Sequence, residues 1–237
     1  NTASINATDV AMNATEITVA GTVNATNDVS LSSNGSMTIN GNVAASRDAN
    51  LTAGSGLSVA GKVTATNATT LNAGSITVNG KVETTNEKTT LTSAEITVNG
   101  SVNTTIGTTT LTSASDLTLN GSGTVSGKAV NVNAGQDFFH NGGSISGENA
   151  VITATRNVQL QGGSIAATNA RVTAGNNMGL ASGSIVADTI ALTATSGAIA
   201  ETDGYVVNAG TLDVAAGQGI NLSSQANKLK NVVIDDA

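Results

Sequence analysis

Residues 69–84 read TTLNAGSITVNGKVET, and this stretch decides the fold because close copies of it recur along most of the chain. Apolar and polar residues alternate in it in three short groups, which predicts three half-buried strands. These groups are 69–72, 75–79 and 81–84. We expect a short turn at 73–74 and a corner at Gly80. Glycine and asparagine recur at such corners, and we attribute this to their tolerance of left-handed backbone conformations.

Aliphatic residues recur about every twenty positions on both sides of Leu71. The series is Leu31, Leu51, Leu71, Leu91, Leu111, Val132, Ile152, Val172 and Leu192. A period of this length is typical of a solenoid, in which one structural unit stacks on itself. We expect this series to point inward, together with pairs such as Ile76 and Val78 from the second strand. The third strand adds Val23, Val43, Val63, Val82, Val102, Ile145, Ile165 and Ile185.

The sequence therefore predicts an all-β fold, a three-sided parallel β-helix with about 20 residues per coil and about 11–12 coils. Crossovers between parallel strands are nearly always right-handed, so we expect a right-handed β-helix. Coils stacked at about 4.8 Å give a rod on the order of 55 Å long. We expect the interior to be too narrow for aromatic side chains, which would explain why they make up 1% of the chain.

The repeat changes along the chain and suggests three sets of coils. Residues 1–121 carry one corner sequence, 122–199 carry a second with GGSI-type corners, and 200–237 diverge from both. Neither end resembles a polar cap, and bare strand edges invite pairing. We therefore expect the chain to continue in a longer protein or to stack on a copy of itself. Residues 1–20 lack the pattern of a signal peptide, so we expect a mature, internal or trimmed chain.

Composition narrows the partners. The net charge of −7 and the pI of about 4.4 argue against nucleic acid. The absence of cysteine excludes disulfides and thiolate metal sites, and it suits a chain exported unfolded through a pore. The sequence contains no run of 18 apolar residues, so it predicts no membrane-spanning helix. We expect no cofactor and no metal.

Catalytic residues are not apparent. His140 is the one histidine, and a triad or a zinc site would need a second histidine or a cysteine, so we interpret it as structural. The carboxylates do not recur in register, and the closest pair, Glu201 and Asp203, reads as solvated charge rather than a glycosidase pair. We predict that the protein is not an enzyme, and a polysaccharide lyase is the weaker alternative.

Polar side chains form outward ladders on the first strand. These residues are Thr70, Asn72, Thr90, Thr92, Thr110 and Thr112. Stacked hydroxyl and amide groups can form a flat glycan-binding face, although threonine and asparagine are also good solvent-facing strand residues. Ice binding is a weaker alternative, because few coils carry Thr-x-Thr.

Asparagine-linked glycosylation is a second possibility on the surface, because Asn-x-Ser/Thr sequons are frequent. The candidate sites are Asn6, Asn13, Asn24, Asn34, Asn50, Asn67, Asn99, Asn103 and Asn120, with a further sequon at Asn221. Unmodified polar corners are the plainer interpretation of the same residues.

Four phrases carry a resemblance to a known family. They are LTAGSGLSVAGKV (51–63), LNAGSITVNGKV (71–82), LTSAEITVNGSV (91–102) and VTAGNNMGLASGSI (172–185). They resemble the haemagglutinin-type repeats of filamentous haemagglutinin-like exoproteins, which are passengers of two-partner secretion. The family's N-terminal secretion domain with its NPNG-type motifs has no counterpart here.

The resemblance implies a right-handed β-helical shaft that leaves the cell through an outer-membrane pore and acts at the bacterial surface. The function expected is attachment or contact, with a surface receptor or glycan of a host cell or another bacterium as partner. The alternative is a subunit that stacks end to end into an extracellular filament or biofilm fibre.

Overall fold

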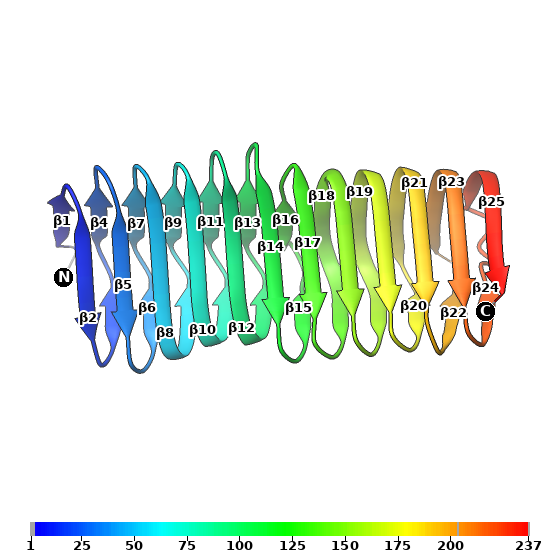
Figure 1. The fold of residues 1–237 in the computed structure, drawn as a ribbon, viewed down its shortest axis with the longest axis horizontal. Helices are drawn as coiled ribbons and strands as arrows, with labels where there is room; N and C mark the ends of the chain where they lie inside the picture. Colours follow the sequence, from blue (N-terminus) through cyan, green and yellow to red (C-terminus); the bar gives the residue numbers. More distant parts are fainter. Residues whose placement is uncertain (1–2, 203, 237) are drawn as a thin grey trace.

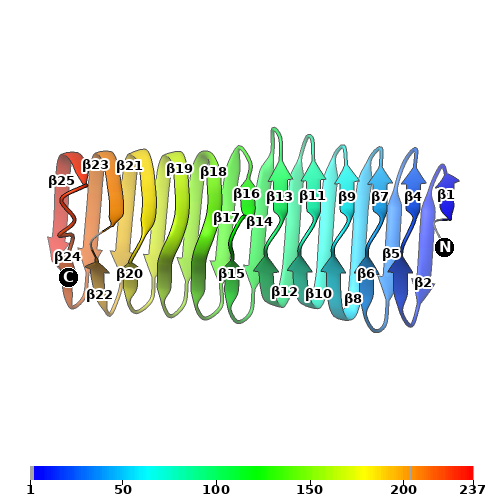
Figure 2. The same ribbon diagram turned by 180° about the vertical axis from the view of Figure 1, so that it is seen from behind.

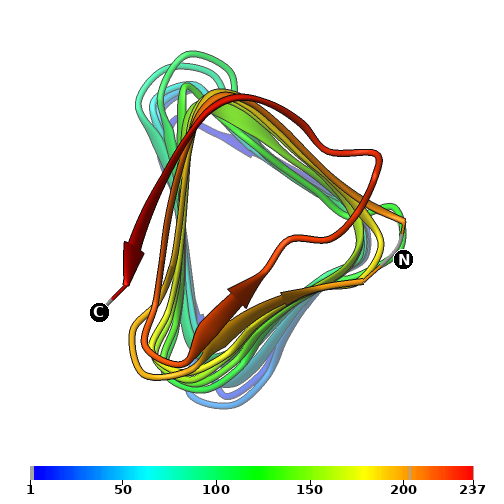
Figure 3. The same cartoon turned by 90° about the vertical axis from the view of Figure 1, so that its right-hand side faces the viewer.

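The computed structural model describes residues 3–202 and 204–236, and every regular element in this part of the chain is a β-strand. Parallel strands stack as a solenoid of about 12 coils, about 20 residues apart, with the termini at opposite ends of a rod (Figures 1 and 2). Seen from its C-terminal end, the chain turns anticlockwise around a triangle as it advances toward the viewer (Figure 3). The coil is therefore right-handed, and the predicted fold is confirmed.

Each coil has three sides, which we name A, B and C. Side A holds β2 (Val10–Ala14), β5 (Val29–Ser33), β14 (Thr108–Ser113) and β17 (Ala129–Ala134). Side B holds β3 (Ile17–Val19), β6 (Met37–Ile39), β15 (Leu117–Leu119), β20 (Met178–Leu180), β22 (Ala198–Glu201) and β24 (Gly219–Asn221). Side C holds β1 (Ser4–Ala7), β4 (Thr22–Ala25), β7 (Asn42–Ala45), β9 (Lys62–Ala65), β11 (Lys81–Thr84), β13 (Ser101–Thr104) and β16 (Thr124–Ser126).

Longer strands bend around the corners of the triangle. From side A onto side B run β8 (Asp48–Val59), β10 (Ala68–Val78) and β12 (Lys88–Val98). Through sides B, C and A run β18 (Phe138–Ala154) and β19 (Val158–Ala174). From side C onto side A run β21 (Gly183–Ala194), β23 (Tyr205–Ala216) and β25 (Lys228–Asp236).

The interior consists of aliphatic columns, as the sequence predicts. Leu51, Leu71, Leu91 and Leu111 lie opposite one another in successive coils, and all four are fully buried. The expected inward residues of sides B and C are buried as well. Like residues stacked at one strand spacing bury their apolar surface without a wide core, so each coil is stabilised mainly by its two neighbours.

The expectation that aromatic rings do not fit the interior is wrong. Phe138 and Tyr205 are the largest fully buried side chains among the described residues. Tyr205 lies opposite Gly183 in the ladder, and Phe138 lies opposite Leu117 and Val158. The interior of the coil therefore accommodates an aromatic ring at these two positions.

The expected turn at 73–74 is also wrong, because β10 passes through this position as a continuous strand. Its backbone pairs with β8 on both sides of the bend, and the register shifts once, between Ala73 and Ser75. Leu71 therefore lies opposite Leu51, whereas Ile76 lies opposite Leu57. A bent strand keeps its ladder of hydrogen bonds, which a turn would interrupt.

The conformational reason given for the corner residues is wrong in the first half of the rod. No residue other than glycine has a positive φ in the described ranges, and the described positive-φ glycines lie at or after Gly121. The earlier corner glycines stack on each other instead. A Cβ atom on Gly61 would overlap the carbonyl oxygen of Gly41, and one on Gly80 would overlap that of Gly61. Close approach of backbones therefore requires glycine there.

Candidate functional site

The predicted polar ladder lies on the outer surface of side A. Thr70, Thr90 and Thr110 are paired in adjacent coils, and Asn72, Thr92 and Thr112 form a parallel column two residues further along each strand. These side chains are half-buried or exposed. The second column continues in both directions as Ser32, Thr52, Asn133, Thr153, Thr173 and Thr193. A glycan-binding role for this face stays a prediction.

The nine candidate glycosylation asparagines fall into two groups. Side-chain hydrogen bonds with a neighbouring coil engage Asn6, Asn24, Asn67, Asn99, Asn103 and Asn120. In contrast, the side chains of Asn13, Asn34 and Asn50 are exposed and make no side-chain hydrogen bond within the described residues. The amide group of these three is therefore open to solvent. Glycosylation itself stays a prediction.

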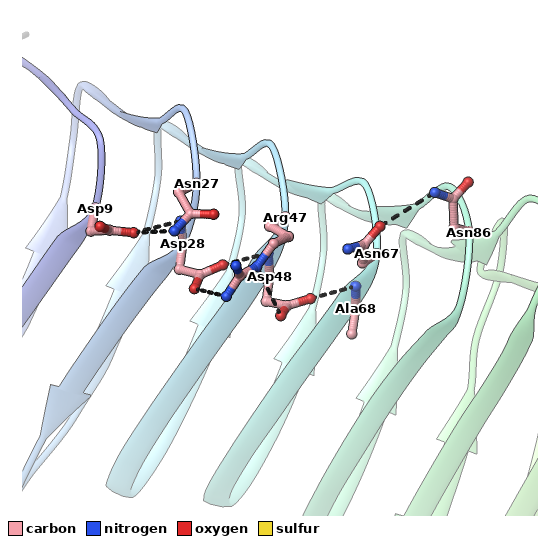
Figure 4. A network of polar contacts seen from close by, with 8 residues as sticks. All are labelled: Asp9, Asn27, Asp28, Arg47, Asp48, Asn67, Ala68 and Asn86. Atoms are coloured by element: carbon pink, nitrogen blue, oxygen red, sulfur yellow. Dashed lines mark hydrogen bonds and ion pairs between the residues drawn. The ribbon is translucent and has the colours of Figure 1, made fainter.

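The expectation that carboxylates do not recur in register is wrong at the corner between sides C and A (Figure 4). Asp9, Asp28 and Asp48 each precede the first inward residue of side A, in three successive coils. The Asp28 carboxylate accepts the backbone N–H of Asp48 at 3.2 Å, and the Asp48 carboxylate accepts that of Ala68 at 3.1 Å. Each carboxylate thus supplies an acceptor for an amide of the next coil.

Arg47 joins this acidic series through two ion pairs. Its guanidinium donates to Asp28 at 2.6 Å and lies 3.8 Å from Asp48. The arginine is half exposed, so the ion pair adds about 0–1 kcal/mol to stability. The arrangement neutralises stacked carboxylates and orders the corner.

A similar relay occupies the corner between sides A and B. Asp137 accepts the backbone N–H of Asn157 at 2.9 Å and pairs with the guanidinium of Arg156. The hydrogen bond from Arg156 holds the pKa of Asp137 below its usual value, against the opposing effect of burial. Asn157 repeats the interaction one coil later with the N–H of Asn177, at 3.1 Å. These polar side chains also link each coil to the next by accepting a backbone N–H.

His140 lies inside the rod, in the column between Leu119 and Leu160. It is 1% exposed, its ring stacks on Phe138 with centroids 6.2 Å apart, and its Nε2 atom has no partner among the described residues. Burial lowers the pKa of His140 to about 4, because a charged imidazolium would lose its hydration there. The imidazole is therefore neutral at pH 7, as a structural side chain would be.

The interpretation of Glu201 as solvated charge is wrong, because its side chain is turned inward and is 3% exposed. The other member of that pair, Asp203, lies outside the described residues. One carboxylate oxygen of Glu201 accepts hydrogen bonds from the Ser224 backbone N–H at 2.9 Å and the Asn227 side chain at 2.8 Å. Asn227 in turn accepts the N–H of Val207 at 2.8 Å, so these groups anchor the last coil.

A chain of buried hydroxyl groups, which the sequence analysis did not predict, lies near the corner between sides C and A. Its members are Thr69, Thr84, Thr89, Thr104 and Thr109. Neighbouring hydroxyl oxygens in this chain are 2.7–2.8 Å apart, and Thr109 donates to the carbonyl oxygen of Ser126 at 2.6 Å. Hydroxyl chains polarise one another in a dry interior, so we regard them as one structural unit.

A hollow in the surface lies on the same corner, where the rod changes profile. Its volume is about 490 Å³, and Thr105, Ile106, Ser126, Lys128 and Glu148 are among its lining residues. Ile106 is 61% exposed at its rim. We name this hollow the step groove. It combines an aliphatic side chain, hydroxyl groups and two opposite charges.

The described ranges hold no cluster of three or more histidine, cysteine, aspartate or glutamate residues that could bind a metal ion. They also contain no helix that is long and apolar enough to cross a membrane. Comparison of the chain with protein-family models, curated proteins and solved structures finds no match.

Proposed function

We propose that the chain forms the rigid shaft of a secreted bacterial surface exoprotein that mediates attachment or contact. The observation that carries the proposal is the parallel ladder that runs through about 12 coils of nearly constant cross-section (Figures 1 and 3). A solenoid in which each coil contacts mainly its neighbours extends in one dimension. Such a rod can hold a binding region at a fixed distance from a cell.

The repeat phrases support secretion as part of this proposal. Their resemblance to filamentous haemagglutinin-like exoproteins implies passage through an outer-membrane pore and a receptor or glycan on another cell. A chain without cysteine forms no disulfide before passage, so it can thread as an extended polypeptide. The partners of the proposed shaft are thus a secretion pore and a surface receptor.

The test is surface labelling of the cells that produce the protein. Antibodies raised against the folded rod are applied to intact cells and to permeabilised cells, with a cytoplasmic protein as control. The proposal predicts equal labelling of both preparations, and antibody fragments that reduce attachment to the target surface. Labelling that requires permeabilisation would contradict it.

A second function, end-to-end assembly into a filament, is favoured by the side chains at the two ends of the described rod. Ile5 and Val232 continue inward columns, yet they are 42% and 47% exposed. A further coil, from the same chain or from a second copy, would cover them. Light scattering separates the two functions, because a filament subunit gains mass with concentration and a shaft segment does not.

A further inference from the structure

The corner between sides C and A carries a ridge that ends in the middle of the rod. In the first half, loops such as 66–67, 85–87 and 105–107 project beyond the strands and stack on one another (Figures 1 and 3). Two coils further on, β18 passes the same corner as a continuous strand with Gly147 at the bend. The step groove is the space left beside the last loop of the ridge.

The last loop of the ridge presents unused hydrogen-bond acceptors. Along the ridge, backbone N–H groups donate to the preceding loop: Asn86 to the carbonyl of Thr66 at 2.7 Å and Ile106 to that of Thr85 at 3.0 Å. The next coil does not continue this pattern, because the N–H of Gly127 donates to Ser146 instead. Within the described residues, the carbonyl oxygens of Thr105 and Ile106 accept no hydrogen bond.

The floor of the step groove carries two charges without ion-pair partners among the described residues. Lys128 and Glu148 are exposed and lie on consecutive coils, where the N–H of Glu148 donates to the carbonyl of Lys128 at 2.9 Å. Their Cα atoms are thus about 4.8 Å apart, one strand spacing. A ligand in the groove meets one positive and one negative group side by side.

We propose that the step groove binds an extended polypeptide segment, which stacks on loop 105–107 as the corner loop that the next coil lacks. Backbone N–H groups of the segment donate to the carbonyls of Thr105 and Ile106, as in the addition of a strand to a sheet edge. Apolar parts of the segment's side chains, such as the methyl groups of threonines, pack on Ile106. Acidic and basic side chains pair with Lys128 and Glu148.

The groove favours a peptide over a sugar for two reasons. The free acceptors continue the spacing of a backbone ladder, which peptide N–H groups match. In addition, the lining contains an isoleucine and no aromatic ring. The proposal depends on the fold alone, so it holds or fails independently of the shaft function.

The probe is a fluorescent, end-capped peptide with the sequence of residues 82–90, VETTNEKTT, because this segment forms the ridge loop below 105–107 and carries an adjacent Glu and Lys. Binding to the full chain is measured by fluorescence anisotropy. We expect saturable binding that Ile106→Asp weakens at least about tenfold. Val186→Asp, a change of an exposed aliphatic residue outside the groove, should leave binding unchanged.

A second probe tests the backbone contacts directly. The same peptide with N-methylated amides at its central residues lacks the required donors, so it should lose binding. Circular dichroism of each variant checks that the rod is intact. Three results would overturn the proposal: no saturable binding up to millimolar peptide, equal binding of the methylated peptide, or binding of oligosaccharides at this groove in place of the peptide.

Discussion

Replacing His140 by leucine should remove most of the acid sensitivity of the middle of the rod. The unfolded chain has an ordinary imidazole with a pKa near 6.5, whereas burial lowers the pKa of folded His140 to about 4. As the pH falls through this window, the unfolded state binds a proton that the folded state refuses. Stability is therefore full above pH 6.5 and declines toward pH 4.

The size of the effect follows from the two pKa values. Linkage gives a loss of about 2 kcal/mol between pH 7 and pH 5, and about 3 kcal/mol by pH 4. Asp137 acts in a separate pH range. Its lowered pKa stabilises the folded state above pH 3.8, and this contribution is lost only as the pH falls below that value. Between pH 7 and 4.5 the contribution of His140 therefore changes, whereas that of Asp137 does not.

The assay is urea denaturation at several pH values, with amide hydrogen exchange in β18 to follow local opening of the coil. The wild-type protein should lose stability as the pH falls to 4.5, and His140→Leu should not. His140→Gln is the matched control, since it keeps a buried polar group that does not titrate. Parallel pH profiles of the wild-type protein and His140→Leu would refute the reasoning.

Three further substitutions, two of them with a control substitution, test the packing of the coils by urea denaturation at pH 7. Gly80→Ala should lower the free energy of unfolding by at least about 2 kcal/mol, because the new Cβ overlaps backbone atoms. Gly56→Ala should be nearly neutral, because the new Cβ meets only a hydroxyl group, at 3.4 Å. Equal effects of the two substitutions would contradict the stacked corner. Thr89→Val should cost about 1–3 kcal/mol by leaving its hydroxyl neighbours unpaired, and Thr90→Val on the outer face much less. Leu91→Asp should unfold the rod locally by burying an unpaired charge, and an unchanged urea midpoint would show that Leu91 does not face inward.

The fold could be predicted from the sequence because inward residues repeat in register. Leu71 and its equivalents recur at nearly constant spacing, and a parallel stack is the arrangement that buries all of them. The strands of each coil could be placed by alternation alone, as for Ile76 and Val78. The bends within continuous strands could not be predicted, because alternation does not distinguish a bent strand from a turn.

The buried polar side chains could not be predicted from the alternation of apolar and polar residues. Alternation places Thr89 inward, but threonine is so common on outer strand positions that its buried hydroxyl partners are not evident. Glutamate is typical of the protein surface, so the sequence suggests that Glu201 is exposed. Its burial depends on the hydrogen bond from Asn227, which the last coil brings next to it. Contacts between coils of different sequence depend on the path of each corner, which the repeat itself does not encode.

The step groove also has a sequence signal that is clear only once the fold is known. The segment from Thr105 to Gly107 ends the series of corner loops, and the next coil passes the same corner through Gly127. A change of corner sequence near residue 121 is visible, but its effect on the outer profile is not. Unpaired backbone acceptors follow from geometry rather than from residue type.

The most direct test of the central claim, that the chain is a rod of interchangeable stacked coils, is small-angle X-ray scattering of the protein and of a variant that lacks residues 69–108. This deletion joins Ala68 to Thr109 in register, because Thr69, Thr89 and Thr109 occupy one column. We predict a monomeric rod about 60 Å long that shortens by about 10 Å with an unchanged cross-section. A variant that unfolds, or that keeps its length while its cross-section changes, would contradict the account.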